Sequence, residues 1–272
     1  MTARFHDTFE ALKQKNEGAF VPFVTLCDPC FDTSLKILNT LTQSGADALE
    51  LGLPFSDPCA DGVTIQAADQ RALKAGSTTQ RCFDLLAKFR ENHQEIPISL
   101  LVYVNLVVVF GTDKFFAEAK KSGVDAVLIA DVPSCMLTAG EDFEAAAHRH
   151  GIELVLIAPS NTDDKTVDFI ARHSEGYVYT LSRFGITGTD NVFGRPVDLI
   201  AKLKARHSAP TLLGFGISTP EHVKIALECG ADGAISGSAV VKLIEKNVHN
   251  EAAMLEDLML FVRAMKAATK KA

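Results

Sequence analysis

Basic clusters are absent from the sequence, and this absence limits the partners that the chain can bind. Lysine and arginine number 27 against 34 aspartates and glutamates, which leaves a formal net charge of −7 at pH 7. The charges are mixed along the chain, and Lys270 and Lys271 are interpreted as a solvated tail. Nucleic acid and anionic membranes are therefore not expected as main partners.

Long apolar runs are also absent. The longest apolar stretch, residues 98–110, is interrupted by Asn105 and is shorter than the roughly 20 residues needed to span a bilayer. We interpret it as a buried strand and the segment that follows it. Residues 1–7 contain no apolar core of a secretory signal, so the expected location is the cytoplasm.

The cysteines do not resemble a disulfide framework. Six cysteines are spread over 272 residues, whereas disulfide frameworks belong to short secreted domains, so reduced thiols are expected. Cys27 and Cys30 have the spacing of a redox motif or of half a zinc site. No second cysteine pair or set of spaced histidines completes a zinc site, so no metal is expected.

What the sequence does contain is a repeated alternation of short apolar strands and amphipathic helices. The predicted strands lie at residues 19–26, 48–51, 98–103, 126–129, 153–157, 177–181, 211–214 and 233–236. The turns at residues 44–48, 122–126 and 229–233 are nearly superimposable, because each ends a helix with glycine and starts a strand after aspartate. Such alternation predicts a parallel sheet.

The predicted helices lie at residues 5–15, 33–42, 63–75, 79–95, 113–122, 140–150, 163–173, 196–205 and 221–229, with another beginning at Ser238. Asp32 is the expected cap of the helix at 33–42, and Asn161 or Thr162 is expected to start the helix at 163–173. No linker rich in proline or serine divides the chain. We therefore predict one α/β domain over residues 1–272, a (β/α)8 or TIM barrel with an extra N-terminal helix and an extra short helix after the eighth strand.

Two carboxylates lie where such barrels carry their chemistry, at the carboxyl ends of strands. Glu50 is late in the second strand between leucines, and Asp61 is in the loop that follows. We see no basic residue on the neighbouring strands to pair with Glu50, which favours an acid with a raised pKa that gives and takes a proton near neutral pH. The alternatives are a structural Glu50 paired with a buried arginine or lysine, and an Asp61 that serves only the turn before Gly62.

Glycine-rich loops follow the seventh and eighth strands, at residues 214–218 and 236–238. Glycines let the backbone approach an oxyanion, and the helix that begins at Ser238 points its free amides and the positive end of its dipole at the same place. These loops predict a phosphate site, with ordinary tight turns as the alternative. Residues 182–194 form a long loop after the sixth strand, interpreted as a mobile lid whose Thr187 could bond a carboxylate, or as a loop with no role.

These segments resemble the tryptophan synthase alpha subunit family. The resemblance is carried by residues 49–52, 54–58 and 60–62, and it extends through residues 18–25, 130–133, 182–183, 185–188, 214–217 and 234–238. It implies a carbon–carbon lyase of tryptophan biosynthesis that cleaves indole-3-glycerol phosphate to indole and glyceraldehyde 3-phosphate. It also implies that no metal or organic cofactor takes part, and that indole passes to a beta subunit that uses pyridoxal phosphate, in an alpha2beta2 complex.

The resemblance assigns roles to residues by position. Glu50 matches the acid/base, and Asp61 matches the carboxylate that accepts the indole N–H and stabilises the positive charge of the protonated ring. The matching phosphate site comprises Gly188, Gly216, Gly237 and Ser238. The matching indole pocket comprises Phe23, Leu101, Tyr179 and Phe215. Thr187 matches the lid residue that meets Asp61 on closure. The regions that match the surface facing the beta subunit contain Asp57, Pro58, Asn105 and Pro133.

Five positions depart from the family pattern. Cysteines at 27 and 30 stand where glycines are usual, Cys59 stands where an aliphatic residue is usual, Phe184 replaces a small lid residue, and Val63 replaces proline. Two other functions remain open at this point. One is another sugar-phosphate barrel, such as an epimerase or indole-glycerol-phosphate synthase, although the predicted strands lack the lysine that the synthase would need. The other is a catalytically weak barrel that acts mainly as an allosteric activator of the beta subunit.

Overall fold

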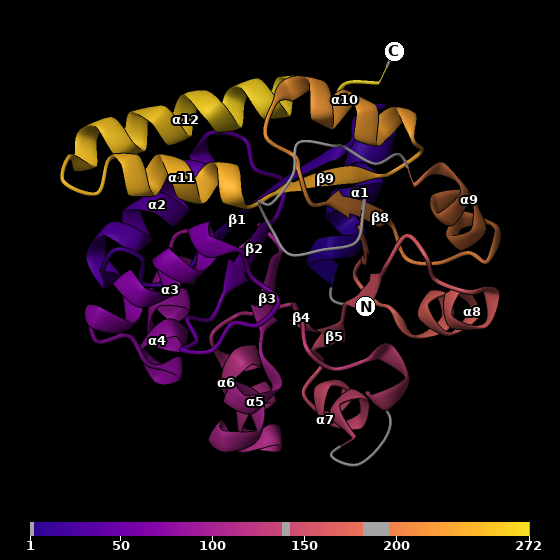
Figure 1. Cartoon of the computed structure of the whole chain (residues 1–272), viewed down its shortest axis with the longest axis horizontal. Coiled ribbons are helices and arrows are strands. Elements are labelled where there is room, and N and C mark those ends of the chain that lie inside the picture. The colour runs from indigo at the N-terminus through magenta and orange to yellow at the C-terminus, as the bar shows by residue number, and fades with distance from the viewer. Residues whose placement is uncertain (1–2, 138–141, 182–195, 272) are drawn as a thin grey trace.

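A barrel of parallel strands lies at the centre of the molecule, surrounded by helices (Figure 1). The structure is a computed structural model that describes residues 3–137, 142–181 and 196–271. The strands in these residues are β1 (Ala19–Thr25), β2 (Leu49–Gly52), β3 (Ile98–Val102), β4 (Ala126–Ile129), β5 (Glu153–Leu154), β6 (Leu156–Ala158), β7 (Val178–Leu181), β8 (Thr211–Gly214) and β9 (Gly233–Ser236).

The predicted fifth strand is divided in two. The strand order is β5-β4-β3-β2-β1-β9-β8-β7-β6, and β5 and β6 are separated in sequence only by Val155. The first half pairs with β4 and the second half with β7, while the Val155 amide donates to the Val127 carbonyl at 3.0 Å. Because barrel strands are tilted and staggered, this short strand bonds one neighbour with each half. The two ends of the sheet meet here, and the predicted barrel is confirmed.

The helices of the described residues are α1 (Ala3–Gln14), α2 (Phe31–Gln43), α3 (Val63–Lys74), α4 (Thr79–Arg90), α5 (Val104–Phe110), α6 (Thr112–Lys121), α7 (Phe143–Arg149), α8 (Asp164–His173), α9 (Val197–Ala205), α10 (Pro220–Glu228), α11 (Ser238–Lys246) and α12 (Glu251–Ala267), with a short 3-10 helix η1 (Ser134–Met136). The extra helices predicted before the first strand and after the last are α1 and α11. Helices α5 and α12 were not predicted from the sequence, and α4 ends five residues before its predicted end. None of the described helices is long and apolar enough to cross a membrane.

Two predicted helix caps were wrong. The N-cap of α2 is Cys30, whose backbone is extended (φ −158°, ψ 169°), and its side chain makes no capping bond. Asp32 lies inside the first turn, where it can only complement the helix dipole. The N-cap of α8 is Asp163, whose carboxylate accepts the Thr166 amide at 2.7 Å. A cap must be the last extended residue before the helix, so its position depends on where the backbone turns.

The repeated turns share one structural role. The aspartate of each turn accepts the backbone amide of a residue on the neighbouring strand: Asp47 from Phe20 at 2.8 Å, Asp125 from Ile98 at 3.0 Å, and Asp232 from Thr211 at 2.8 Å. The glycine before each aspartate has a positive φ, which glycine adopts without strain. These turns therefore connect the amino ends of adjacent strands.

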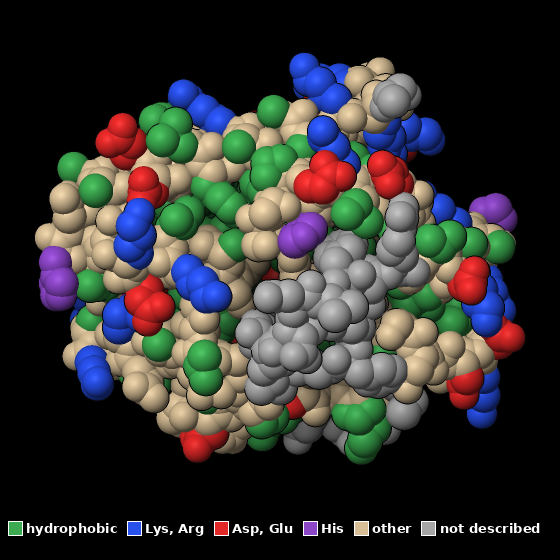
Figure 2. All heavy atoms as spheres, turned by 45° about the horizontal axis from the view of Figure 1, so that its top comes forward, with side chains coloured by type: hydrophobic (Ala, Val, Ile, Leu, Met, Phe, Trp, Pro, Cys, Tyr) green, Lys and Arg blue, Asp and Glu red, His purple; other side chains and the backbone are tan. Residues whose placement is uncertain are grey.

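Helix α1 closes the amino end of the barrel. The Phe5 ring packs against the Tyr177 ring, with 5.6 Å between centroids, just before β7 begins. Arg4 bonds buried Asp125 at 2.7 Å, and Arg90 of α4 bonds the same carboxylate at 3.0 Å. The carboxyl end, where such barrels carry their chemistry, is the end that α1 leaves uncovered. Figure 2 shows basic and acidic side chains interspersed over one face of the molecule.

Candidate active site

Glu50 is a buried, protonatable acid inside the barrel. It lies on β2 beside Phe23 of β1 and Ser99 of β3, and it is 1% exposed. The Tyr177 hydroxyl donates to Glu50 Oε1 at 2.8 Å and lies 3.1 Å from Ser99 Oγ. Because tyrosine has one hydroxyl proton, Ser99 must donate to Tyr177 when Tyr177 donates to Glu50.

The surroundings of Glu50 raise its pKa to about 8. Burial is the main cause, the Tyr177 hydrogen bond opposes it, and the negative charge of Asp61 adds to it. Among the described residues, no lysine, arginine or histidine forms an ion pair with Glu50. The structural alternative, a buried pair with a basic residue, is therefore not observed there.

The carboxylate of Asp61 is held by an aromatic side chain. It lies in the loop between β2 and α3 (residues 53–62, the β2–α3 loop), and Tyr103 donates to its Oδ2 at 2.7 Å. The Tyr103 oxygen accepts the Ala60 amide at 3.0 Å, and the Tyr103 ring stacks on Phe55 with 5.2 Å between centroids. Burial raises the pKa of Asp61, and the bond from Tyr103 opposes this rise. The loop and the carboxylate are thus fixed together.

Three of the four residues of the predicted apolar pocket lie in or against one cluster inside the barrel. Phe23 and Tyr179 are buried, Leu101 is partly buried against them, and Tyr177 belongs to the same cluster. The charges of Glu50 and Asp61 both contribute to raising the pKa of Tyr179, after burial, so both acids act on this ring. Gly237 lies beside Phe23, since a Cβ there would contact the ring at 3.5 Å.

The two glycine loops lie next to each other. Ser236 Oγ at the end of β9 donates to the Ile217 carbonyl after β8 at 2.7 Å. Phe215 and Gly216 have φ of 71° and 79°, and Gly216 is exposed. Gly237 is the N-cap of α11 and Ser238 is its first residue, so free amides of the helix begin here. The arrangement can hold an anion at the carboxyl end of the barrel.

Other predicted residues fall into two groups. Thr187, Gly188 and the departure Phe184 lie outside the described residues. Of the residues predicted to face a partner, Asp57, Asn105 and Pro133 are exposed, whereas Pro58 is buried. Exposed apolar side chains occur near them, at the start of α3, in α5 and in η1: Val63 is 78% exposed, Val109 80% and Met136 54%.

The cysteine pair of the sequence motif is not a pair in the structure. Cys27 is buried, and its Sγ lies 3.9 Å from that of buried Cys82, while Cys30 is exposed beside Thr33. Among the described residues, no group of histidine, cysteine or acidic side chains could hold a metal ion.

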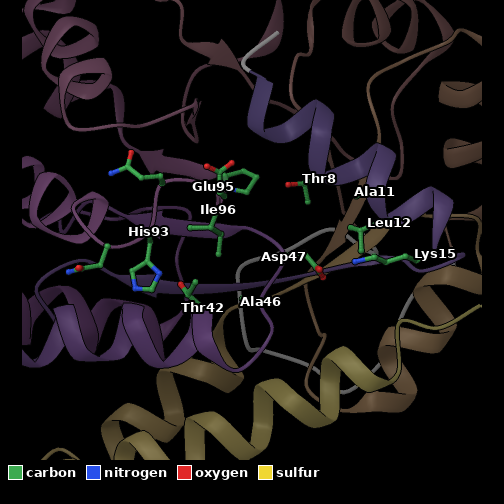
Figure 3. Close-up of a pocket in the computed structure, with 13 residues that line it drawn as sticks. Thr8, Ala11, Leu12, Lys15, Thr42, Ala46, Asp47, His93, Glu95 and Ile96 are labelled. Carbon is green, nitrogen blue, oxygen red and sulfur yellow. The ribbon is translucent and has the colours of Figure 1, made fainter.

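A pocket at the opposite end of the barrel is separate from this site. It has a volume of about 460 Å³ and lies between α1 and the segments that precede β2 and β3 (Figure 3). The labelled side chains in Figure 3 include Lys15 just after α1, Asp47 of a repeated turn and His93 after α4. These elements lead into strands at their amino ends, so the pocket does not reach Glu50 or Asp61.

Comparison with known proteins identifies the family. The family model of the tryptophan synthase alpha chain matches residues 9–270. The tryptophan synthase alpha chain of Actinobacillus pleuropneumoniae serotype 5b is 55% identical over 270 residues, covering 98% of this chain and 99% of its own length. That of Escherichia coli O127:H6 is 52% identical over 269 residues, with 98% and 99% coverage. The chain belongs to the tryptophan synthase alpha chain family.

Solved structures agree with this assignment. The tryptophan synthase subunit alpha of Legionella pneumophila has a TM-score of 0.87 at 29% identity, covering 98% of each chain. A chain from the tryptophan synthase a2b2 complex of Pyrococcus furiosus has a TM-score of 0.80 at 36% identity, covering 92% of this chain and 98% of its own.

Two tyrosines of this alpha chain site were not predicted from the sequence. Tyr177 and Tyr103 each lie two residues from a predicted pocket residue, Tyr179 and Leu101 respectively. Alternate residues of a strand point to the same face, so this spacing was a usable signal. Asp69 on α3 was not predicted either, although it is a buried carboxyl whose pKa is raised to about 8, mainly by burial. The sequence signal for Asp69 was a charge on the face of the helix that carries Ile65 and Ala72.

Proposed function

We propose that Glu50 and Asp61 carry out the alpha reaction of tryptophan synthase, the cleavage of indole-3-glycerol phosphate to indole and glyceraldehyde 3-phosphate. The observation that supports this most directly is the buried Glu50 carboxyl, with a pKa of about 8 and a hydrogen bond from Tyr177 instead of an ion pair among the described residues. Near neutral pH it holds a proton that it can transfer and recover.

The reaction needs two proton transfers around one carbon–carbon bond. Glu50 gives its proton to the indole ring carbon that bears the glycerol chain, and the ring becomes cationic. Asp61 accepts the indole N–H and stabilises this positive charge. Glu50, now a carboxylate, takes the proton of the adjacent side-chain hydroxyl, and the bond between ring and side chain breaks. Its electrons restore the aromatic ring, which leaves indole, the aldehyde and a protonated Glu50.

The remaining assignments place the substrate. We assign the indole ring to the apolar pocket of Phe23, Leu101, Tyr179 and Phe215. We assign the phosphate to Gly216, Gly237 and Ser238, supported by the adjacent loops and the start of α11. Thr187 and Gly188 are proposed as the lid residue that meets Asp61 and a further phosphate contact. No step of this scheme requires a metal or an organic cofactor.

The decisive test is indole release by Glu50→Gln, which keeps the shape of the side chain but cannot act as an acid. We expect indole production from indole-3-glycerol phosphate to fall by at least about a thousandfold, with the fold intact by circular dichroism. The control is Glu10→Gln at an exposed glutamate of α1. A Glu50→Gln protein that retains wild-type turnover would contradict the proposal.

We further propose that this chain binds a tryptophan synthase beta subunit in an alpha2beta2 complex and works in the cytoplasm, with pyridoxal phosphate only in the beta subunit. Support comes from the exposed Val63, Val109 and Met136, which follow β2, β3 and β4 at the end where indole would leave. Asp57, Pro58, Asn105 and Pro133 belong to the same loops and helices.

Binding to a purified beta subunit tests the partner. Val109→Asp should weaken binding in calorimetry by about tenfold or more, because it places a charge in an apolar contact. Leu260→Asp is the matched control, since Leu260 is a 56% exposed side chain on α12. Equal weakening by both variants would argue against this surface. Adding the beta subunit to the lyase assay also shows whether the chain acts mainly as its activator.

A further inference from the structure

Asp69 is a buried carboxyl that the mechanism above does not use. It lies on α3 and is 4% exposed. Two residues further along the same helix, Arg71 bonds Asp28 through two nitrogens, each at 2.8 Å. The guanidinium thus pairs with Asp28 instead of Asp69. Among the described residues, Asp69 has no basic partner.

Neutral donors from two other elements contact Asp69. The Thr25 hydroxyl, at the end of β1, donates to Asp69 Oδ1 at 3.3 Å. The backbone amide of Phe55, in the β2–α3 loop, lies beside this carboxyl and favours its charged form. One side chain therefore joins the end of a barrel strand, the loop that carries Asp61 and the helix that follows that loop.

The contacts continue from Asp69 to the catalytic carboxylate. Phe55, whose amide lies beside Asp69, stacks on Tyr103, and Tyr103 donates to Asp61 Oδ2. A shift of the loop at Phe55 would therefore displace the hydroxyl that holds Asp61. Because misplacement of a catalytic group by about 1 Å can cost a hundredfold in rate, this support bears on turnover.

We propose that Asp69 is a positioning residue for the lyase reaction, which anchors the β2–α3 loop through Phe55 and β1 through Thr25 so that Tyr103 presents Asp61 to the indole nitrogen. The inference rests on the proposed function of Glu50 and Asp61. The contacts of Asp69 with Thr25 and Phe55 need only an acceptor oxygen on Asp69, so an amide in place of the carboxyl preserves the anchor.

The charged groups around Asp69 indicate which protonation state serves the reaction. Asp61 of the loop and Asp28 after β1 both raise the pKa of Asp69, while Arg71 is occupied by Asp28 and contacts Glu245 of α11 at 3.5 Å. A neutral Asp69 adds no second negative charge beside that of Asp61. Asparagine reproduces this neutral state at every pH.

The test compares Asp69→Asn with Asp69→Ala in steady-state kinetics of indole release. We expect Asp69→Ala to lower kcat by about tenfold or more with KM changed by less than about threefold, because Asp61 acts on the charge formed in the transition state. Asp69→Asn should retain kcat within about threefold at pH 7 and should lose any pH dependence due to Asp69. Gln70→Ala, at the exposed neighbour on α3, is the matched control.

Three results of this comparison would contradict the role of Asp69. A wild-type kcat in Asp69→Ala, an equal loss in the alanine and asparagine variants, or a loss confined to KM would overturn the inference. If Asp69→Ala does not fold, Thr25→Val is measured in its place. We expect Thr25→Val to lower kcat by about threefold. An unchanged kcat in this variant would overturn the inference. Glu50→Gln, assayed alongside, separates the two proposals: if it retains turnover the proposed function fails, and if it alone loses turnover only the role of Asp69 fails.

Discussion

The hydroxyl of Tyr177 donates a hydrogen bond of 2.8 Å to Glu50, across 127 positions of sequence. The ring of Tyr177 rests on Phe5 of α1, so the helix that closes the amino end of the barrel also supports the donor to the acid. This bond favours the charged form of Glu50, whereas burial favours the neutral form. The balance between them sets the pKa of about 8.

Replacing Tyr177 with phenylalanine should raise the pKa of Glu50. The charged carboxylate loses its donor, so the protonated acid persists to higher pH, and the alkaline limb of the kcat/KM profile should move upward by about one pH unit. The measurement is indole release between pH 6 and 10. The acidic limb serves as the internal control. An unmoved alkaline limb would show that the hydrogen bond from Tyr177 does not affect the pKa of Glu50.

Replacing Tyr103 with phenylalanine should act on the opposite limb. In the proposed reaction Asp61 must be ionised to stabilise the indole cation, and in this variant it loses the donor that lowers its pKa. The acidic limb should therefore move to higher pH, while the alkaline limb stays in place. The Ala60 amide also loses its acceptor, so kcat should fall by about tenfold. The same limb moving in both tyrosine variants would refute the division of roles between Glu50 and Asp61.

Glu50→Gln should stabilise the fold at alkaline pH while removing activity. The folded pKa of Glu50, about 8, lies above that of an exposed glutamate, so between these values the folded state binds a proton that the unfolded state has lost. Stability from this group therefore declines as pH rises from about 4.5 to 8. Glutamine has no proton to lose. We expect a higher urea midpoint than wild type at pH 8.5, with the two converging near pH 5.

The matched control for this stability test is Asp113→Asn. Asp113 is an exposed residue of α6, and its pKa is lowered by His150 and then Arg149. The stability that Asp113 contributes is present above its pKa in the unfolded chain and is lost as pH falls through its pKa in the folded protein. Asp113→Asn should therefore be less stable than wild type at neutral pH. A Glu50→Gln protein that is less stable than wild type at pH 8.5 would mean that ionised Glu50 is a favourable part of the fold.

Gly214→Ala should weaken substrate binding through Tyr179. A Cβ at the end of β8 would overlap the Tyr179 hydroxyl and ring, and the ring belongs to the proposed indole pocket. We expect KM to rise by about tenfold or more, because the displaced ring narrows the pocket. Tyr179→Leu in the same chain should recover part of the loss. Absence of recovery in the double variant, measured as kcat/KM, would place the damage elsewhere.

Patterns within single segments determined the architecture. Alternation of apolar strands with amphipathic helices predicted the barrel, and the three Gly-x-Asp turns predicted its repeating unit, because period and turn chemistry are local properties of the chain. Glu50 could be singled out in the same way, since a lone carboxyl between leucines on a buried strand needs an explanation.

Contacts between distant segments were decided only by the tertiary structure. The donors to Glu50 and Asp61, the division of the fifth strand at Val155 and the anchoring of the β2–α3 loop by Asp69 depend on how the strands are staggered and how the barrel closes. No local pattern carries that information: a tyrosine at the start of one strand reaches an acid 127 residues earlier only because closure brings both inside the same barrel.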